Sequence, residues 1–149
     1  MEIERKFLIR ELPQNLTSYP HHEIEQAYLN ENPVIRIRKR DDDYILTYKS
    51  RGLMVRQELE VPLTREAYEH LLSKADGRII SKTRYLIPDG PYTVELDVFH
   101  GDLEPLLLAE VEFDSEEAAQ DFPMPDWFEK DVTMDPAYHN VTMALHPKV

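Results

Sequence analysis

The chain opens Met1-Glu2-Ile3-Glu4-Arg5-Lys6-Phe7-Leu8, with Glu2, Glu4 and Lys6 at every second position. In a β-strand, alternate side chains project to the same face. This stretch therefore predicts a strand that is charged on one face and carries Ile3 on the opposite, apolar face.

The same two-residue spacing of charges recurs five times along the chain, with an apolar residue between most partners. Ile37, Leu59, Leu96 and Val111 occupy those intervening positions, so they would lie on an apolar face that can pack against other elements. We expect a sheet with a charged face and an apolar face. The charged pairs are Arg36 and Arg38, Glu58 and Glu60, Lys82 and Arg84, Glu95 and Asp97, and Glu110 and Glu112.

Alternation of charged and apolar residues, interrupted by turn residues, predicts eight strands. The connections are short, as at Asn32-Pro33 and Gly101-Asp102, and short connections favour antiparallel neighbours. The predicted strands are Met1 to Arg10, Glu23 to Asn30, Val34 to Arg40, Tyr44 to Ser50, Val55 to Pro62, Arg78 to Ile87, Tyr92 to Phe99 and Pro105 to Phe113.

Two helices and a tail complete the predicted single domain, residues 1–149. Thr64 can cap a helix that runs to about Ala75, and Ser115 can cap a second one that stops before Pro123. From about residue 126 we expect a C-terminal helical tail that docks on the barrel, because Trp127 and its neighbour Phe128 are costly to expose.

Composition excludes several classes of protein. The net charge of −12 argues against nucleic acid and anionic membranes as partners, and the absence of cysteine excludes thiolate metal sites and thiol nucleophiles. No apolar run is long enough for a membrane span, and the N-terminus has no secretory signal. We therefore expect a cytoplasmic protein, either a monomer or a homodimer.

The charged pairs have two interpretations. Each could face water on a half-buried sheet, paired with opposite charges across strands. However, like charges on one strand repel, and the chain has six such sets. They favour a mainly β protein with some helix (α+β). We expect an eight-stranded antiparallel closed β-barrel whose lumen holds side chains of both positive and negative charge. Carboxylate oxygens are the ligands that Mg²⁺ or Mn²⁺ prefers, and the candidates are Glu2, Glu4, Asp97, Glu110 and Glu112. Basic side chains can donate hydrogen bonds to phosphate oxygens, and the candidates are Lys6, Arg36, Arg38, Lys49, Lys82 and Arg84.

Other kinds of site have little support. The four glycines are too far apart for a phosphate-binding loop, and no nucleophile motif of an acyl-transfer enzyme is present. The six histidines show no metal-ligand spacing, so we expect surface or packing roles for them.

The opening Glu2-Ile3-Glu4-Arg5-Lys6 resembles the ExExK signature of the CYTH superfamily, the triphosphate tunnel metalloenzymes. Seven further segments resemble family segments in the same order, and the chain resembles the short bacterial inorganic triphosphatases among the members. The segments are Gln26-Ala27-Tyr28-Leu29, Ile35-Arg36-Ile37-Arg38, Leu46-Thr47-Tyr48-Lys49, Gln57-Glu58-Leu59-Glu60, Lys82-Thr83-Arg84-Tyr85, Glu95-Leu96-Asp97-Val98-Phe99 and Ala109-Glu110-Val111-Glu112-Phe113.

The resemblance implies an eight-stranded tunnel that binds a small-molecule triphosphate with one or two divalent ions, Mg²⁺ or Mn²⁺. It implies that Glu2, Glu4 and Glu112 hold the metal, with Glu110 and Asp97 as further ligands. It also implies that Lys6 and Tyr28, expected on neighbouring strands, form a catalytic dyad. The six basic residues named above would grip the substrate. Glu58 and Glu60 would either join the metal shell or orient a basic side chain.

The leading hypothesis for function is metal-dependent hydrolysis of the terminal phosphoanhydride of inorganic triphosphate, with nucleoside or thiamine triphosphates as further substrates. A class IV adenylyl cyclase that makes cyclic AMP from ATP is the alternative within the family. A noncatalytic module that binds polyphosphate or nucleotide, and an acidic structural domain without ligand, are alternatives from other classes.

Overall fold

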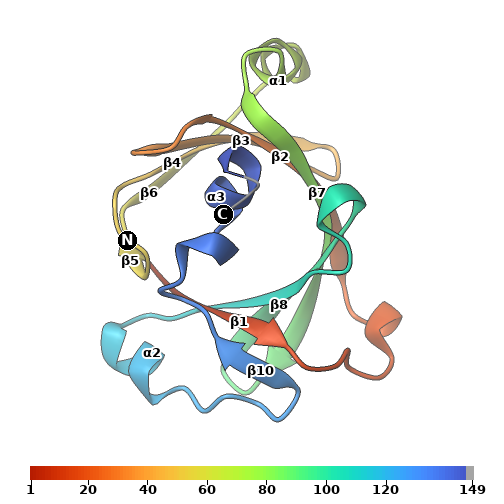
Figure 1. Ribbon diagram of the computed structural model, residues 1–149, viewed down its shortest axis with the longest axis vertical. Coiled ribbons are helices and arrows are strands. Elements are labelled where there is room, and N and C mark those ends of the chain that lie inside the picture. Colours follow the sequence, from red (N-terminus) through yellow and green to blue (C-terminus); the bar gives the residue numbers. More distant parts are fainter. Residues whose placement is uncertain (147–149) are drawn as a thin grey trace.

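A computed structural model describes residues 1–146 as one ten-stranded sheet that curls into a barrel (Figure 1). The strands are β1 (Glu2–Ile9), β2 (His21–Asn30), β3 (Val34–Arg40), β4 (Asp43–Lys49), β5 (Val55–Arg56), β6 (Glu58–Pro62), β7 (Asp76–Asp89), β8 (Tyr92–Phe99), β9 (Leu107–Glu112) and β10 (Phe128–Asp131). The helices are α1 (Arg65–Leu72), α2 (Glu116–Asp121) and α3 (Asn140–Leu145), with 3₁₀ turns η1 (Leu16–Ser18), η2 (Gly101–Leu103) and η3 (Pro136–Tyr138).

Every strand pair is antiparallel, and the order across the sheet is β10-β1-β9-β8-β7-β2-β3-β4-β6. The ring closes through β5, which pairs with β1 in the register Glu2 to Arg56 and Ile3 to Val55. Since β6 continues β5 and pairs with β4, this one segment joins the two ends of the sheet. The predicted antiparallel barrel is confirmed.

The strand count differs from the prediction at two places. The segment predicted as a single strand from Val55 to Pro62 is divided at Gln57, because its first part pairs with β1 and its second part with β4. A further strand, β10, forms where only helical structure was expected, and it adds to the free side of β1.

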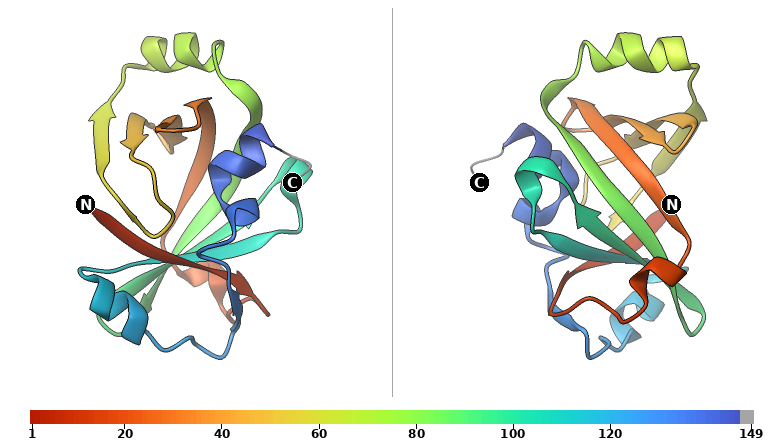
Figure 2. Two further views of the ribbon diagram at one scale, coloured as in Figure 1. Left: turned by 60° about the vertical axis from the view of Figure 1, so that its left-hand side comes forward. Right: turned by 90° about the vertical axis from the view of Figure 1, so that its right-hand side faces the viewer.

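The two predicted caps are present. The hydroxyl of Thr64 accepts a hydrogen bond from the Ala67 amide at 3.0 Å, and Ser115 accepts one from Ala118 at 3.0 Å. As Figures 1 and 2 show, α1 and α2 lie outside the ring of strands, on opposite sides of the barrel. None of the helices within residues 1–146 is long and apolar enough to cross a membrane.

The apolar faces of the strands point outward and are covered by the helices and the tail. Phe7 on β1 packs against Phe122 and Phe128, with ring centroids 6.0 and 4.7 Å away. Under α1, Tyr68 packs on Ala27 and Ile37. The expectation that every intervening apolar residue packs is wrong for Leu59, which is 61% exposed because β6 borders the sheet where no helix covers it.

The C-terminal segment enters the ring of strands. After β10, the chain passes through η3 into α3, which lies inside the outline of the barrel and packs against β7 and β2 (Figure 1). The approach to β7 is close at Gly77, which has φ +66°, and a Cβ atom there would overlap the carbonyl oxygen of Ala144. One end of the barrel is therefore closed by the chain's own last helix.

Arg5 connects β1 to both α2 and β10 on the outside of the barrel. Its Nη1 donates to the carbonyl oxygens of Ala119 and Phe122 at 2.7 and 3.3 Å, and its Nη2 donates to Asp131 at 2.8 Å. The guanidinium also lies 4.9 Å from the centre of the Phe7 ring. This side chain satisfies carbonyls at the end of α2 that have no intrahelical partner.

Replacing Arg5 with Met removes these hydrogen bonds while keeping much of the aliphatic stem. We expect the free energy of unfolding to fall by about 2 to 4 kcal/mol, because hydrogen bonds to charged groups contribute about 1.5 to 3 kcal/mol each and half-buried carbonyls lose their donors. Urea unfolding followed by tryptophan fluorescence measures this change.

Arg65→Met is the matched control, since Arg65 pairs with Glu69 on the exposed surface of α1. Its effect should be much smaller than that of Arg5→Met, because exposed ion pairs contribute little to stability. Equal losses in the two variants would show that Arg5 contributes no more than a surface charge.

Candidate functional site

The charged strand faces meet inside the barrel around a cavity of about 160 Å³. Apart from Val34 and Val141, every residue in its wall is polar, charged or aromatic. The wall holds seven glutamates and seven basic side chains. They are Glu2, Glu4, Glu58, Glu60, Glu95, Glu110 and Glu112, and Lys6, Arg36, Arg38, Arg40, Lys49, Arg56 and Arg84.

Strand register brings opposite charges together. Lys6 and Glu110 lie directly opposite each other on β1 and β9, and Lys6 Nζ donates to Glu110 Oε1 at 2.8 Å. Lys49 Nζ lies 3.0 and 3.1 Å from the two oxygens of Glu2, but only the contact to Oε2 has hydrogen-bond geometry. Burial favours the neutral form of Glu110, yet Lys6 and Arg84 hold its pKa well below its usual range.

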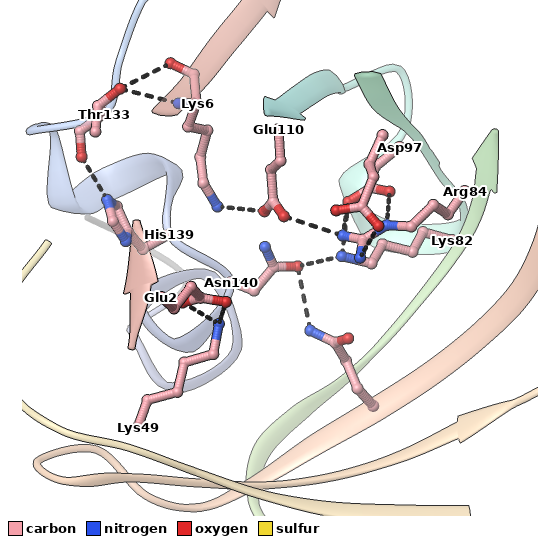
Figure 3. Close-up of polar contacts among 12 residues, drawn as sticks. Glu2, Lys6, Lys49, Lys82, Arg84, Asp97, Glu110, Thr133, His139 and Asn140 are labelled. Carbon is pink, nitrogen blue, oxygen red and sulfur yellow. Dashed lines mark hydrogen bonds and ion pairs between the residues drawn. The ribbon is translucent and has the colours of Figure 1, made fainter. Parts of the chain in front are cut away.

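Lys82 and Asp97 lie behind the cavity wall rather than in it. Both are essentially buried, and Lys82 Nζ donates to Asp97 at 2.7 Å. Arg84 also donates to Asp97, through Nε at 2.8 Å and Nη2 at 2.9 Å. Burial lowers the pKa of Lys82 to about 7, whereas Arg84 and Lys82 together keep the pKa of the buried Asp97 below its ordinary value. Asp97 therefore anchors Lys82 and Arg84, and of these two Arg84 lines the cavity (Figure 3).

A second group of carboxylates has too few positive partners. Glu4 and Glu112 lie directly opposite each other on β1 and β9, and the side chain of Glu4 makes no hydrogen bond or ion pair among residues 1–146. Burial and then the charge of Glu110 raise the pKa of Glu4, and burial with Glu2 and Glu4 nearby raises that of Glu112 to about 6. Glu2 Oε1 is buried without a hydrogen-bond partner. This corner of the cavity has spare acceptor capacity and excess negative charge.

Hard divalent cations such as Mg²⁺ and Mn²⁺ prefer carboxylate oxygens, so Glu2, Glu4 and Glu112 fit such an ion by chemistry and by charge. Within residues 1–146, no three acidic or histidine side chains already converge on one point. Glu2 is held by Lys49, and Glu110 by Lys6 and Arg84. The first of these contacts must loosen for Glu2 to join a shared ion.

The opposite wall carries excess positive charge. Arg36 Nη2 donates to Thr47 at 3.0 Å, while its buried Nε has no hydrogen-bond partner. Arg38 donates to the amide oxygen of Gln26 through Nε at 2.9 Å and Nη2 at 2.7 Å. Burial, with Arg36 and Arg84 nearby, lowers the pKa of Arg38 to about 9, so Arg38 remains protonated at neutral pH. These uncompensated guanidinium groups favour a polyanion.

Tyr28 and Lys6 are not on neighbouring strands, so that expectation is wrong. In the sheet order, β9, β8 and β7 lie between β1 and β2. Both side chains nevertheless line the cavity. The hydroxyl oxygen of Tyr28 accepts from Gln26 Nε2 at 3.0 Å, which leaves the hydroxyl proton for another acceptor.

Glu58 and Glu60 lie at the rim, on β6. Glu58 is 3.5 Å from Lys49, and Glu60 is 4.0 Å from Arg36 and accepts from Thr47 at 3.3 Å. In this arrangement both act as partners of basic side chains.

Sequence reasoning missed the polar residues that the C-terminal segment adds to the cavity wall. His139 was expected on the surface or in incidental packing, but it is 5% exposed and lines the cavity beside Asn140. Gln26, which bridges Arg38 and Tyr28, lies in a segment that resembles the family but is uncharged and has no charged pattern of its own. Neither the tail nor a lone glutamine carries a spacing signal, because their positions depend on how the barrel closes.

Comparisons with known proteins agree with this geometry. A family model described as the CYTH domain matches residues 1–130. An inorganic triphosphatase of Nitrosomonas europaea is 43% identical over 97% of this chain and 97% of the relative. One of Acetivibrio thermocellus is 32% identical over 98% of this chain and 94% of the relative. A crystal structure of an inorganic triphosphatase, 39% identical, has a TM-score of 0.72 and covers 97% of this chain and 95% of that chain.

The buried imidazole of His139 predicts a loss of stability in acid. Its Nε2 donates to the carbonyl oxygen of Thr133 at 2.8 Å, and burial, with Lys6 and Arg56 nearby, lowers its pKa to about 4. Below pH 6.5 the unfolded chain binds a proton that the folded chain does not. Stability is therefore complete above pH 6.5 and falls by about 3 kcal/mol as the pH drops to 4.

His139→Gln keeps an N–H donor without a titrating ring. Urea unfolding at several pH values should show a smaller acid loss between pH 6.5 and 4 in this variant than in the wild type. His70→Gln, a change on the exposed side of α1, serves as the control and should leave the wild-type slope unchanged. If the free energy of unfolding depended on pH in the same way in all three proteins, His139 would not be the cause of the acid loss.

Proposed function

The chain belongs to the CYTH family, and on that basis we propose that it is a divalent-metal-dependent hydrolase that cleaves the terminal phosphoanhydride of inorganic triphosphate. The observation that carries the proposal is the cavity inside the barrel with its acidic and basic walls, in a chain that is 43% identical to an inorganic triphosphatase over nearly the whole length of both. Nucleoside and thiamine triphosphates are further candidate substrates.

The basic wall would bind the substrate. Triphosphate carries about four to five negative charges, and guanidinium groups bind phosphate oxygens through parallel hydrogen bonds. Arg36, with a buried and unpaired Nε, and Arg38, held in place by Gln26, both line the cavity. Arg84 is fixed by Asp97 and Glu110, so it needs little reorganisation to stabilise charge on the substrate.

The acidic corner would hold the metal, as one ion or two. We assign Glu2, Glu4 and Glu112 as ligands, because their carboxylates carry the uncompensated negative charge. Glu110 and Asp97 are already engaged by Lys6, Lys82 and Arg84, which supports a role for them in orienting the basic side chains. When bound, Mg²⁺ or Mn²⁺ supplies Lewis-acid stabilisation of charge on the phosphate oxygens.

In the reaction, a water oxygen forms a bond to the terminal phosphorus while the bridging P–O bond breaks, which yields orthophosphate and pyrophosphate. Lys6, whose ammonium is oriented by Glu110, donates to a phosphate oxygen as negative charge builds up. Tyr28 can protonate the leaving oxygen, since its own oxygen already accepts from Gln26, and the proton that the attacking water loses restores the Tyr28 hydroxyl through solvent. The two residues approach the substrate from different walls of the barrel.

The proposal places this reaction in the cytoplasm, in a monomer or homodimer. It includes no nucleic-acid partner, because a net charge of −12 repels phosphate backbones outside the cavity.

Hydrolysis can be tested with purified protein, Mg²⁺ or Mn²⁺ and a panel of inorganic triphosphate, ATP and thiamine triphosphate. We expect inorganic triphosphate to give the highest kcat/KM, with orthophosphate and pyrophosphate as products. Arg36→Ala and Lys6→Ala should each lower kcat by about 10²- to 10³-fold, which is the typical effect of removing one preorganised donor.

Arg65→Ala, on the exposed face of α1, is the control and should retain full activity. Cyclic AMP from ATP would instead identify a cyclase. Wild-type turnover in the Arg36 and Lys6 variants would falsify the assignment of the cavity as the active site.

Metal binding is tested separately by Glu4→Gln, which removes a buried charge that lies opposite Glu112. Without metal, we expect the variant to melt about 2 to 4 °C above the wild type, since relieving the repulsion stabilises the fold by about 1 kcal/mol. Added Mg²⁺ or Mn²⁺ should then raise the melting temperature of the wild type more than that of the variant.

Glu116→Gln, on the exposed surface of α2, controls for the change in net charge. If the metal raised the melting temperature of Glu4→Gln as much as that of the wild type, Glu4 would not be a ligand.

A further inference from the structure

Asn140 brings an uncharged amide into the charged cavity from the C-terminal helix. It is the first residue of α3, is 8% exposed, and lines the cavity next to His139. It lies beyond residues 1–130, the part of the chain that matches the family. Figure 3 shows its side chain projecting among residues of the barrel wall, between Glu2 and Lys82.

Two neighbours fix which way the amide of Asn140 points. Lys82 Nζ, which is ion-paired with Asp97 at 2.7 Å, donates to Oδ1 at 3.1 Å, so the oxygen of the amide faces Lys82. Gln26 Nε2 lies 3.3 Å from the same oxygen. The oxygen of Gln26 accepts two hydrogen bonds from Arg38, so the Gln26 nitrogen is the end that faces Asn140.

The nitrogen of the Asn140 amide is therefore the end that remains for a ligand. Its Oδ1 accepts from both Lys82 and Gln26, while Nδ2 makes no hydrogen bond with any side chain or backbone group of residues 1–146. Among the carboxylates of the cavity wall, Glu110 already accepts from Lys6 and Arg84. A phosphate oxygen would supply the missing acceptor.

Docking of α3 does not require a polar residue at this position. The helix is held by apolar contacts of Met143 and Ala144, which are 7% and 0% exposed and pack with Ile80 and Val132. A side chain that only closed the barrel could be apolar, as Val141 is in the same wall. The amide of Asn140 is thus an addition to the packing, and its geometry matches the recognition of an anion.

We propose that Asn140 is a substrate-binding residue, whose Nδ2 donates to a phosphate oxygen of triphosphate while its Oδ1 holds Lys82 and Gln26 in place. This inference rests on the proposed function for the identity of the ligand. It assigns to the C-terminal helix a direct part in substrate recognition, so that the helix is a wall of the binding site as well as a closure of the barrel.

Asn140→Asp is the decisive variant. It has almost the same shape and keeps an oxygen for Lys82 and Gln26, but it replaces the donor with a negatively charged acceptor. We expect KM for inorganic triphosphate to rise by about 10- to 100-fold, with a smaller change in kcat, because a charge-assisted hydrogen bond is exchanged for repulsion. Asn140→Ala removes both the donor for the substrate and the oxygen that accepts from Lys82 and Gln26, so it should lower kcat as well as raise KM.

Thr142→Asp is the matched control, since it adds the same charge to the same helix at a position outside the cavity wall. It should keep the wild-type KM. Melting temperatures of all variants, and calorimetric titration with tripolyphosphate in EDTA, give readouts that do not depend on turnover. The dissociation constant should rise in Asn140→Asp and stay unchanged in Thr142→Asp.

The outcomes separate this inference from the proposed function. If the wild type binds tripolyphosphate without hydrolysing it and Asn140→Asp weakens binding, the hydrolase proposal fails and the role of Asn140 stands. If the wild type hydrolyses triphosphate and Asn140→Asp retains its KM and affinity, the role of Asn140 is overturned. Equal losses in Asn140→Asp and Thr142→Asp would also overturn it, because the effect would then belong to the charge of the helix.

Discussion

Seven glutamates and seven lysines and arginines share one cavity in a barrel of 149 residues, and the need to compensate these charges shapes the rest of the structure. Each buried charge loses hydration worth several kcal/mol unless partners replace it. The pairs that replace it come from neighbouring strands, as with Lys6 and Glu110, or from a layer behind the wall, as with Asp97 between Lys82 and Arg84. Closure of the barrel is required, because only a ring places the acidic strands opposite the basic ones.

The charges are not fully compensated at two places in the cavity. At each place a bound ligand would supply the missing opposite charge. Around Glu4 and Glu112 there is excess negative charge, and around Arg36 and Arg38 there is excess positive charge. A fold selected for stability alone would neutralise these corners with protein groups. The uncompensated walls are consistent with a site whose full charge balance exists only when a cation and a polyanion are bound together.

The C-terminal segment has a larger part in this site than its position in the chain suggests. It first extends the sheet as β10, where Arg5 ties it to β1 and α2, and then turns into the barrel as α3. His139 and Asn140 contribute neutral polar groups to a cavity that otherwise consists mostly of charges. A neutral amide can orient a lysine without adding to the charge of the wall, which a carboxylate in the same place could not do.

The sequence by itself determined which residues face inward. Alternation has a period of two in strands, so the spacing of Glu2, Glu4 and Lys6 predicts their shared face directly, and the same argument selects Arg36 with Arg38 and Glu110 with Glu112. The antiparallel barrel, its eight principal strand segments and the capped starts of α1 and α2 could be predicted for the same reason. These features depend on local geometry and on neighbours in the chain.

The tertiary structure decided which inward residues meet and how deep they lie. Lys6 and Tyr28 lie on strands separated by three others. Asp97 and Lys82 are buried behind the cavity wall, to which Arg84 contributes. Likewise, the split at Gln57 that closes the ring and the entry of Asn140 into the cavity follow from long-range pairing. Periodicity specifies the face on which a side chain lies, but strand order, register and closure set its distance from partners more than a hundred residues away.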